Sequence, residues 1–200
     1  MMKLVKRLEG KYFVAVSGGA DSMAALHWLH TRRKIQVEAI TYVHNDDTKF
    51  CWRARDLVEQ YCGIMSIPLH WSSSPNHYES NREHLWREER YEFMAKIQEE
   101  KGGHPIITAH HLDDAVETYV MSFLTSGTPK YLPYSRSNPD VIRPFLMSRK
   151  KDMRSYCYEN SVPFLDDPMN DGSQCKRGML RKDILPNLYN FNPGLHKQCE

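Results

Sequence analysis

A chain of 200 residues and 23.5 kDa, 40% apolar and 26% charged, indicates one ordinary domain or one domain with a small appendage. Charged residues interrupt the apolar runs, which excludes a membrane span of about 20 apolar residues. No secretory leader opens the chain, so we expect a cytoplasmic protein with no membrane partner. The net charge of +2 demands no polyanionic partner, although basic residues gather in 143–154 and 175–182. The five cysteines form no C-x-x-C pair, and we expect reduced thiols.

Over the first 125 residues, short β-like runs alternate with helical stretches, which predicts an open, mostly parallel α/β sheet. The predicted strands cover residues 11–16, 36–43, 65–71 and 105–109. The predicted helices cover residues 22–33, 49–62 and 81–101, and a fourth carries an apolar stripe of Val116, Tyr119, Val120, Phe123 and Leu124 that we assign to the core. After a crossing loop at 125–144, we expect a helix at 147–160, a polar loop at 166–174 and a last helix at 179–189.

A glycine turn separates the first predicted strand from the first predicted helix. It consists of Ser17, Gly18, Gly19, Ala20, Asp21 and Ser22. Free N–H groups and the positive end of a helix dipole meet in such a turn, which makes it a candidate phosphate site, although a plain structural turn is also compatible. It lacks the third glycine of the dinucleotide fingerprint and the G-K-[ST] of a Walker A loop. Because a carboxylate repels phosphate, Asp21 indicates a Mg²⁺ or cationic-substrate contact, or else a helix cap.

The second constellation reads A-H-H-L-D-D-A-V-E-T over residues 109–118, at the end of the fourth predicted strand. Ligands of open α/β sheets bind beyond the carboxyl ends of the strands, so we expect this segment to face the same crevice as the glycine turn. Its histidines and carboxylates suit a metal site or acid–base chemistry, and helix capping by Asp113 and Asp114 is the structural alternative. A helical zinc site fits less well because His110 and His111 are adjacent rather than four residues apart.

At these residues the sequence resembles known proteins. The 17–22 turn resembles the pyrophosphate loop of the N-type ATP pyrophosphatases, and 109–118 is similar to the A-H-x-x-D-D-x-x-E-T segment of tRNA(Ile)-lysidine synthetases. Further segments agree with that family in order: R-x-x-R-Y at 87–91, R-P-F-L at 143–146, D-x-x-N at 167–170 and the ending at 177–186. The resemblance implies a Rossmann-like adenine nucleotide alpha hydrolase (PP-loop ATPase) domain over 1–130. A small helical C-terminal extension over 131–200 would complete the catalytic domain.

The resemblance also implies a reaction in which ATP, with Mg²⁺, adenylates the wobble cytidine of an isoleucine tRNA before lysine displaces AMP. The loop residues 17–22 and His110 would bind the nucleotide, with Asp21 next to Mg²⁺. Catalytic roles would fall to Asp21, Arg90, Asp114 and Arg181. Substrate-binding roles would fall to Arg87, Asp113, Glu117 and Arg177.

The sequence departs from the family pattern at Ala115, Ser126 and Gly178. Two alternatives therefore stay open. One is another PP-loop reaction, such as small-molecule amidation or tRNA thiolation, and the other is a catalytically weakened nucleotide- or RNA-binding homologue. Because the net charge is only +2, we expect contact with tRNA to depend on the basic clusters at 149–154 and 176–182, or on a homodimer.

Overall fold

Six strands form one sheet in the order β3-β2-β1-β4-β6-β5 in the computed structural model, which describes residues 1–44, 49–76, 78, 82–137, 140–167 and 176–198. The strands are β1 (Gly10–Ala15), β2 (Ile35–Val43), β3 (Leu69–Ser73), β4 (Ile106–Ile107), β5 (Ser135–Ser137) and β6 (Asp140–Ile142). Neighbouring strands run parallel except β5, which pairs antiparallel with β6. The predicted α/β class is therefore confirmed, and the short strand β4 lies between β1 and β6.

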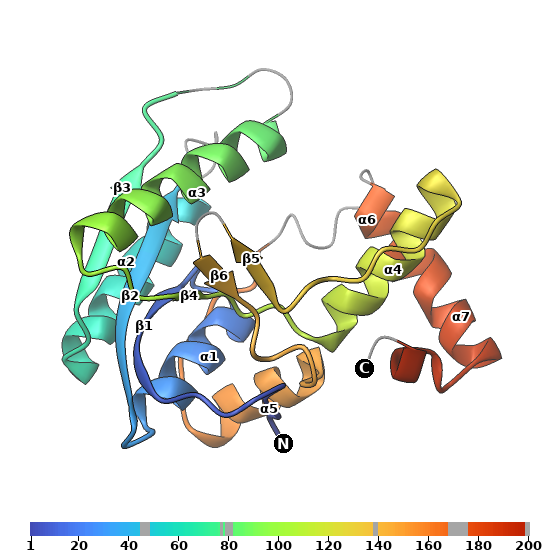
Figure 1. Ribbon diagram of the computed structural model, residues 1–200, viewed down its shortest axis with the longest axis horizontal. Coiled ribbons are helices and arrows are strands. Elements are labelled where there is room, and N and C mark those ends of the chain that lie inside the picture. The colour runs from blue at the N-terminus through green and yellow to red at the C-terminus, as the bar shows by residue number, and fades with distance from the viewer. Residues whose placement is uncertain (45–48, 77, 79–81, 138–139, 168–175, 199–200) are drawn as a thin grey trace.

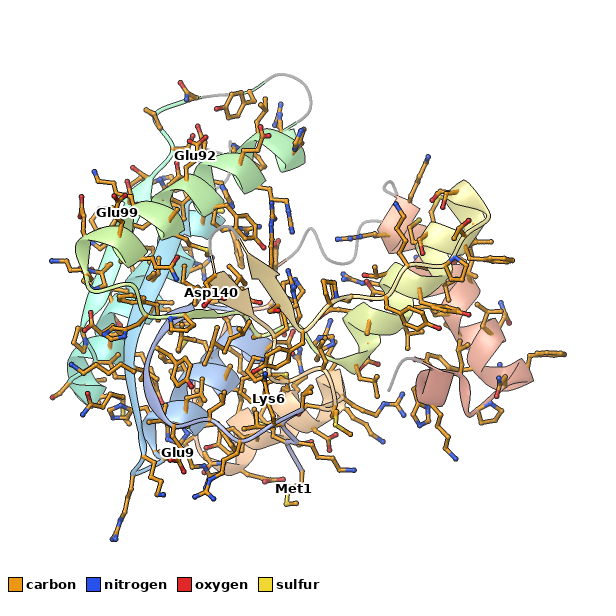
Figure 2. The ribbon with its side chains drawn as sticks, viewed as in Figure 1. Met1, Lys6, Glu9, Glu92, Glu99 and Asp140 are labelled. Atoms are coloured by element: carbon orange, nitrogen blue, oxygen red, sulfur yellow. The ribbon has the colours of Figure 1, made fainter. Side chains whose placement is uncertain are left out.

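Helices cover both faces of this sheet (Figure 1). They are α1 (Ala20–His30), α2 (Phe50–Met65), α3 (Arg82–Glu100), α4 (Leu112–Ser126), α5 (Lys150–Glu159), α6 (Lys176–Met179) and α7 (Leu185–Phe191). Successive strand residues point to opposite faces: Val14 packs with α1, α2 and α5, whereas Phe13 packs against α3. On the outer side of α3, Glu92 and Glu99 project into solvent (Figure 2).

Helices α4, α6 and α7 form a lobe to one side of the sheet (Figure 1). Its small core contains Val116 and Val120 of α4 with Leu180 and Leu185, which belong to the π-helical turn Leu180–Ile184 and to α7. Pro186 lies in the first turn of α7, directly after the π-helical turn. None of the helices in the described ranges is both long and apolar enough to cross a bilayer.

Three sequence predictions differ from this fold. Helix α2 passes Gly63 and ends at Met65, and its C-cap Ser66 has a left-handed φ of 55°, so the third strand begins at Leu69 rather than at residue 65. The predicted loop at 125–144 contains β5 and β6. The apolar stripe of α4 is only partly core, because Phe123 is 55% exposed and Leu124 is 57% exposed. Since β5 and β6 join the sheet, the segment after residue 130 shares the α/β core; a boundary at 130 stays a prediction.

The turn from β1 into α1 is held against α2. Gly18 has a φ of +80°, and a Cβ placed there would lie 3.0 Å from the Ala54 Cβ and 3.1 Å from the Ala54 carbonyl oxygen. The carbonyl oxygen of Gly18 also accepts a hydrogen bond from Leu165 N at 2.9 Å. Position 18 therefore requires glycine for its backbone angle and for its close approach to α2.

We expect Gly18→Ala to lower the free energy of unfolding by about 2 kcal/mol, because it adds both left-handed strain and overpacking. Urea unfolding measures the loss. Gly19→Ala is the matched control, since Gly19 has a φ of −77° and its nearest contact for a new Cβ is 3.6 Å away. Equal losses in the two variants would contradict this account of the turn.

Candidate functional site

The loop from Ser17 to Ser22 is closed by the side chain of Ser22. Its Oγ accepts a hydrogen bond from Ser17 N at 3.1 Å and donates one to the Gly19 carbonyl oxygen at 3.0 Å. Within the described ranges, no hydrogen bond uses the N–H of Gly18, Gly19 or Ala20. These groups lie at the N-terminus of α1, where the helix dipole is positive, so the loop can cradle an anion.

Asp21 and His111 connect this loop with α4. The Nε2 of His111 lies 3.5 Å from Asp21 Oδ2, and the histidine side chain is 5% exposed. As the N-cap of α4, the His111 Nδ1 accepts a hydrogen bond from Asp114 N at 3.3 Å, which leaves Nε2 to carry the proton toward Asp21. The two predicted constellations are thus joined through one buried side chain, to which the family resemblance assigns no role.

The adjacent histidines have opposite pKa shifts. Burial lowers the pKa of His110 to about 4, with Arg143 and Arg87 adding to the effect and Asp114 opposing it. Burial also acts to lower the pKa of His111, but Asp21, Asp114 and Asp113 outweigh it and the pKa is raised. His110 is therefore neutral at pH 7, with its Nδ1 2.8 Å from the Thr108 hydroxyl, while His111 takes a proton more readily.

The carboxylates of α4 divide into two groups. Arg181 reaches Glu117 with its Nε at 2.5 Å from Oε1, and its Nη2 lies 3.9 Å from Asp114 Oδ1. Asp114 also accepts a hydrogen bond from His111 N at 3.0 Å. Asp113 instead accepts one from Lys150 N at 2.7 Å, at the start of α5. The structure therefore brings Asp114, Glu117 and Arg181 together, and it turns Asp113 toward α5.

The predicted arginines Arg87 and Arg90 both belong to α3, and Arg87 acts electrostatically on His110. Arg87 is exposed and donates from Nη2 to the Tyr91 hydroxyl at 3.3 Å. Arg90 is half-buried, and among the described residues its guanidinium has no hydrogen bond or ion pair; burial lowers its pKa. Arg143 is 3% exposed and donates to the Pro133 carbonyl oxygen at 2.8 Å.

Arg143 had no predicted role, although the R-P-F-L segment marks its position. Burial lowers its pKa and the Tyr91 hydroxyl opposes that shift. In contrast, Arg177 is exposed on α6, and nothing described joins it to Arg181 or to the carboxylates of α4. Residues 168–170 of the predicted D-x-x-N segment lie outside the described residues.

A candidate metal ligand lies in the loop. In the ranges that the structure describes, no group of three or more His, Cys, Asp or Glu could hold a metal ion. A Mg²⁺ ion bound with substrate phosphates needs only one or two protein carboxylates. Asp21 fits that requirement, because its Oδ1 is buried and has no hydrogen-bond partner in the described part of the chain.

An open, mostly parallel sheet with a candidate anion cradle beyond β1 and a polar cluster beyond β4 is the arrangement of a nucleotide-binding α/β domain. The chain belongs to the PP-loop domain family, whose model matches residues 2–188.

Curated relatives agree with the resemblance that the motifs predict. The chain is 31% identical over 194 residues to the tRNA(Ile)-lysidine synthase of Thermotoga maritima, with 92% of this chain and 47% of the relative covered. It is 31% identical over 199 residues to the enzyme of the same name from Bacillus subtilis, covering 94% and 42%. The chain thus spans about half the length of these relatives.

A solved structure supports the fold. The U34-tRNA thiolase NcsA from Methanococcus maripaludis matches with a TM-score of 0.77 at 15% identity, over 99% of this chain and 70% of that one. At this identity the likeness concerns the fold alone, and it confirms the predicted PP-loop architecture.

The lowered pKa of His110 predicts a loss of stability in acid. The unfolded chain binds a proton at this histidine near its ordinary pKa of 6.5, whereas the folded chain does so only near 4. The stability that His110 contributes is therefore present above pH 6.5 and is lost as the pH falls through 4, at no more than about 1.4 kcal/mol per pH unit.

We expect His110→Asn to flatten this decline, measured by urea unfolding between pH 4 and 7. His111→Asn is the matched control. Asparagine retains an N-cap acceptor, and because the pKa of His111 is raised, its replacement should leave the acid-side decline in place. The assignment fails if His110→Asn follows the wild-type pH curve.

Proposed function

We propose that this chain is the catalytic PP-loop domain of an ATP-dependent tRNA-modifying ligase of the tRNA(Ile)-lysidine synthetase type. The observation that carries the proposal is the position of His111, which contacts a carboxylate of the phosphate loop and the Asp114 carboxylate of α4. Groups suited to phosphate and groups suited to an ammonium thus lie within reach of one side chain. The family motifs and the names of the curated relatives support the same reaction.

In the proposed reaction, the ring carbonyl oxygen of the wobble cytidine attacks the α-phosphorus of ATP, and pyrophosphate leaves. The amine of lysine then attacks the ring carbon that carries this oxygen and loses a proton. AMP leaves with the former carbonyl oxygen. Both steps place negative charge on phosphate oxygens, which fixed N–H donors and cations stabilise.

The loop residues Ser17–Ser22 would hold the β- and γ-phosphates through the N–H groups that the described fold leaves unused. Asp21 would hold Mg²⁺ through Oδ1, and the ion would supply charge neutralisation next to the phosphates. Arg90, half-buried and without a described partner, would stabilise charge at the α-phosphate.

Asp114 is the carboxylate that we assign to the ammonium of lysine. Glu117 is buried and closely paired with Arg181, whereas Asp114 keeps Oδ1 at a longer 3.9 Å from that arginine. An ammonium that approaches Asp114 therefore displaces no close ion pair. Arg181 would orient the two acids by bridging them, and a held amine is delivered in a fixed position to its target carbon.

We expect Asp114→Asn to reduce lysine transfer at least about 100-fold with the fold intact, because the amide loses the charge that holds the ammonium. Asparagine still accepts from His111 N, so the helix cap survives. The assay incubates the protein with ATP, labelled lysine and bulk tRNA, and follows both AMP and label in RNA. Asp183→Asn, an exposed carboxylate in the same lobe, is the control and should transfer normally.

The same assay separates the alternatives. Lysine-independent release of AMP by the wild-type chain would favour another PP-loop reaction. Bound ATP without AMP under any substrate set would favour a weakened binding protein. Near-normal transfer by Asp114→Asn would contradict the role given to this carboxylate.

A further inference from the structure

A groove between α3 and β5 is not used by the proposed reaction. It encloses about 340 Å³ and is lined by His84, Arg87, Glu88, Tyr91, Glu92, Ala95 and Arg136. All of these residues belong to α3 except Arg136, which lies on β5, the strand at the edge of the sheet (Figure 1). The groove therefore lies between α3 and the strand at one edge of the sheet.

Two guanidinium groups meet over one aromatic ring in this groove. The guanidinium carbon of Arg87 lies 4.9 Å from the centroid of the Tyr91 ring, and that of Arg136 lies 4.7 Å from it. Tyr91 is 9% exposed, while both arginines are exposed. Cation–π contact holds two like charges near each other although they repel. Neither arginine forms an ion pair within the described ranges, so most of their N–H donors face solvent.

This arrangement suits a single phosphodiester. Guanidinium groups bind phosphate oxygens through paired, charge-assisted hydrogen bonds, and two of them can grip one phosphate from different sides. Glu88 and Glu92 line the same groove and repel a longer run of phosphates. The groove therefore provides one anionic contact at the Arg87–Arg136 pair and not an extended basic track.

Tyr91 and Arg87 link the groove with residues next to the candidate reaction centre. The Tyr91 hydroxyl lies next to Arg143, and Arg143 and Arg87 both act electrostatically on His110. His110 precedes the N-cap of α4, from which Asp114 projects. An RNA strand with a phosphate between Arg87 and Arg136 can thus direct its next nucleotide toward the end of β4.

We propose that the Arg87–Tyr91–Arg136 groove binds one backbone phosphate of the RNA strand that carries the reactive base. This proposal rests on the proposed function, because it takes the substrate to be RNA. It assigns a contact to Arg136, which no motif marks, and it makes Tyr91 a positioning residue that holds both guanidinium groups.

The test is the salt dependence of RNA binding, measured by fluorescence anisotropy with labelled bulk tRNA and the full chain. We expect Arg136→Ala to weaken binding about tenfold at low salt. The slope of log affinity against log salt should become shallower by about 0.7, the value for one phosphate contact on a single strand. Arg136→Lys should retain the slope and recover part of the affinity, since it keeps the charge without the planar fork.

Lys96→Ala is the matched control, because Lys96 is an exposed cation of α3 outside the groove, 4.0 Å from Glu100. It should bind tRNA as the wild type does. Thermal unfolding of each variant verifies that the fold is retained. An unchanged salt slope in Arg136→Ala, or equal losses in Arg136→Ala and Lys96→Ala, would overturn the proposal.

Two further measurements distinguish an RNA contact from a nucleotide contact, and failure of this proposal from failure of the proposed reaction. Affinity for ATP should be the same in the wild type and in Arg136→Ala; a loss of ATP affinity in the variant would assign the pair to the nucleotide and overturn the RNA contact. If the wild type transfers no lysine but Arg136→Ala still shows the shallower slope, the RNA contact stands and the proposed reaction fails. If the wild type transfers lysine but the salt slope of Arg136→Ala equals that of the wild type, the proposed reaction stands and the RNA contact fails.

Discussion

The parallel pairing of β1 with β4 is the constraint on which the candidate site depends. Only two residue pairs form this contact, Phe13 with Ile106 and Val14 with Ile107, yet they join segments more than ninety residues apart. Because the strands are parallel, the residues that follow them emerge at the same edge of the sheet. The phosphate loop and the start of α4 are neighbours for this reason, and the 3.5 Å approach of His111 to Asp21 follows from it.

Beyond the carboxyl ends of β1 and β4, acidic and basic side chains lie around different histidines. His110 feels Arg143 and Arg87, whereas His111 is surrounded by Asp21, Asp113 and Asp114, so two adjacent imidazoles have opposite pKa shifts. On the acidic side Asp114 suits an ammonium group and Asp21 suits a Mg²⁺ ion next to the phosphate loop, whereas the arginines suit phosphate directly. A reaction that joins an amine to a phosphate-activated base needs both kinds of group without neutralising them against each other, and alternation at two successive residues provides that separation.

Local sequence predicted the glycine turn between β1 and α1 and the start of α4, because glycine, capping and apolar periodicity act within a few residues. It failed at β5, whose Ser-Arg-Ser sequence has no apolar residue and becomes a strand only by pairing with β6. Local sequence also could not predict the contacts of His111 and Arg143. Which of two adjacent histidines faces the loop depends on the extended N-cap backbone of His111, and the burial of Arg143 depends on α3 packing above β6.

The distribution of free cations matters more than the net charge of +2. The two basic clusters expected from the sequence contain arginines that the fold pairs with acids: Arg154 binds Asp166 through two hydrogen bonds of 2.7 and 2.6 Å, and Arg181 binds Glu117. A cation that already has a carboxylate partner must lose it before it can bind phosphate, which reduces its net gain. Arg87 and Arg136 stack on Tyr91 and form no ion pair in the described ranges, so under the proposed function they can bind an RNA phosphate without losing a carboxylate partner.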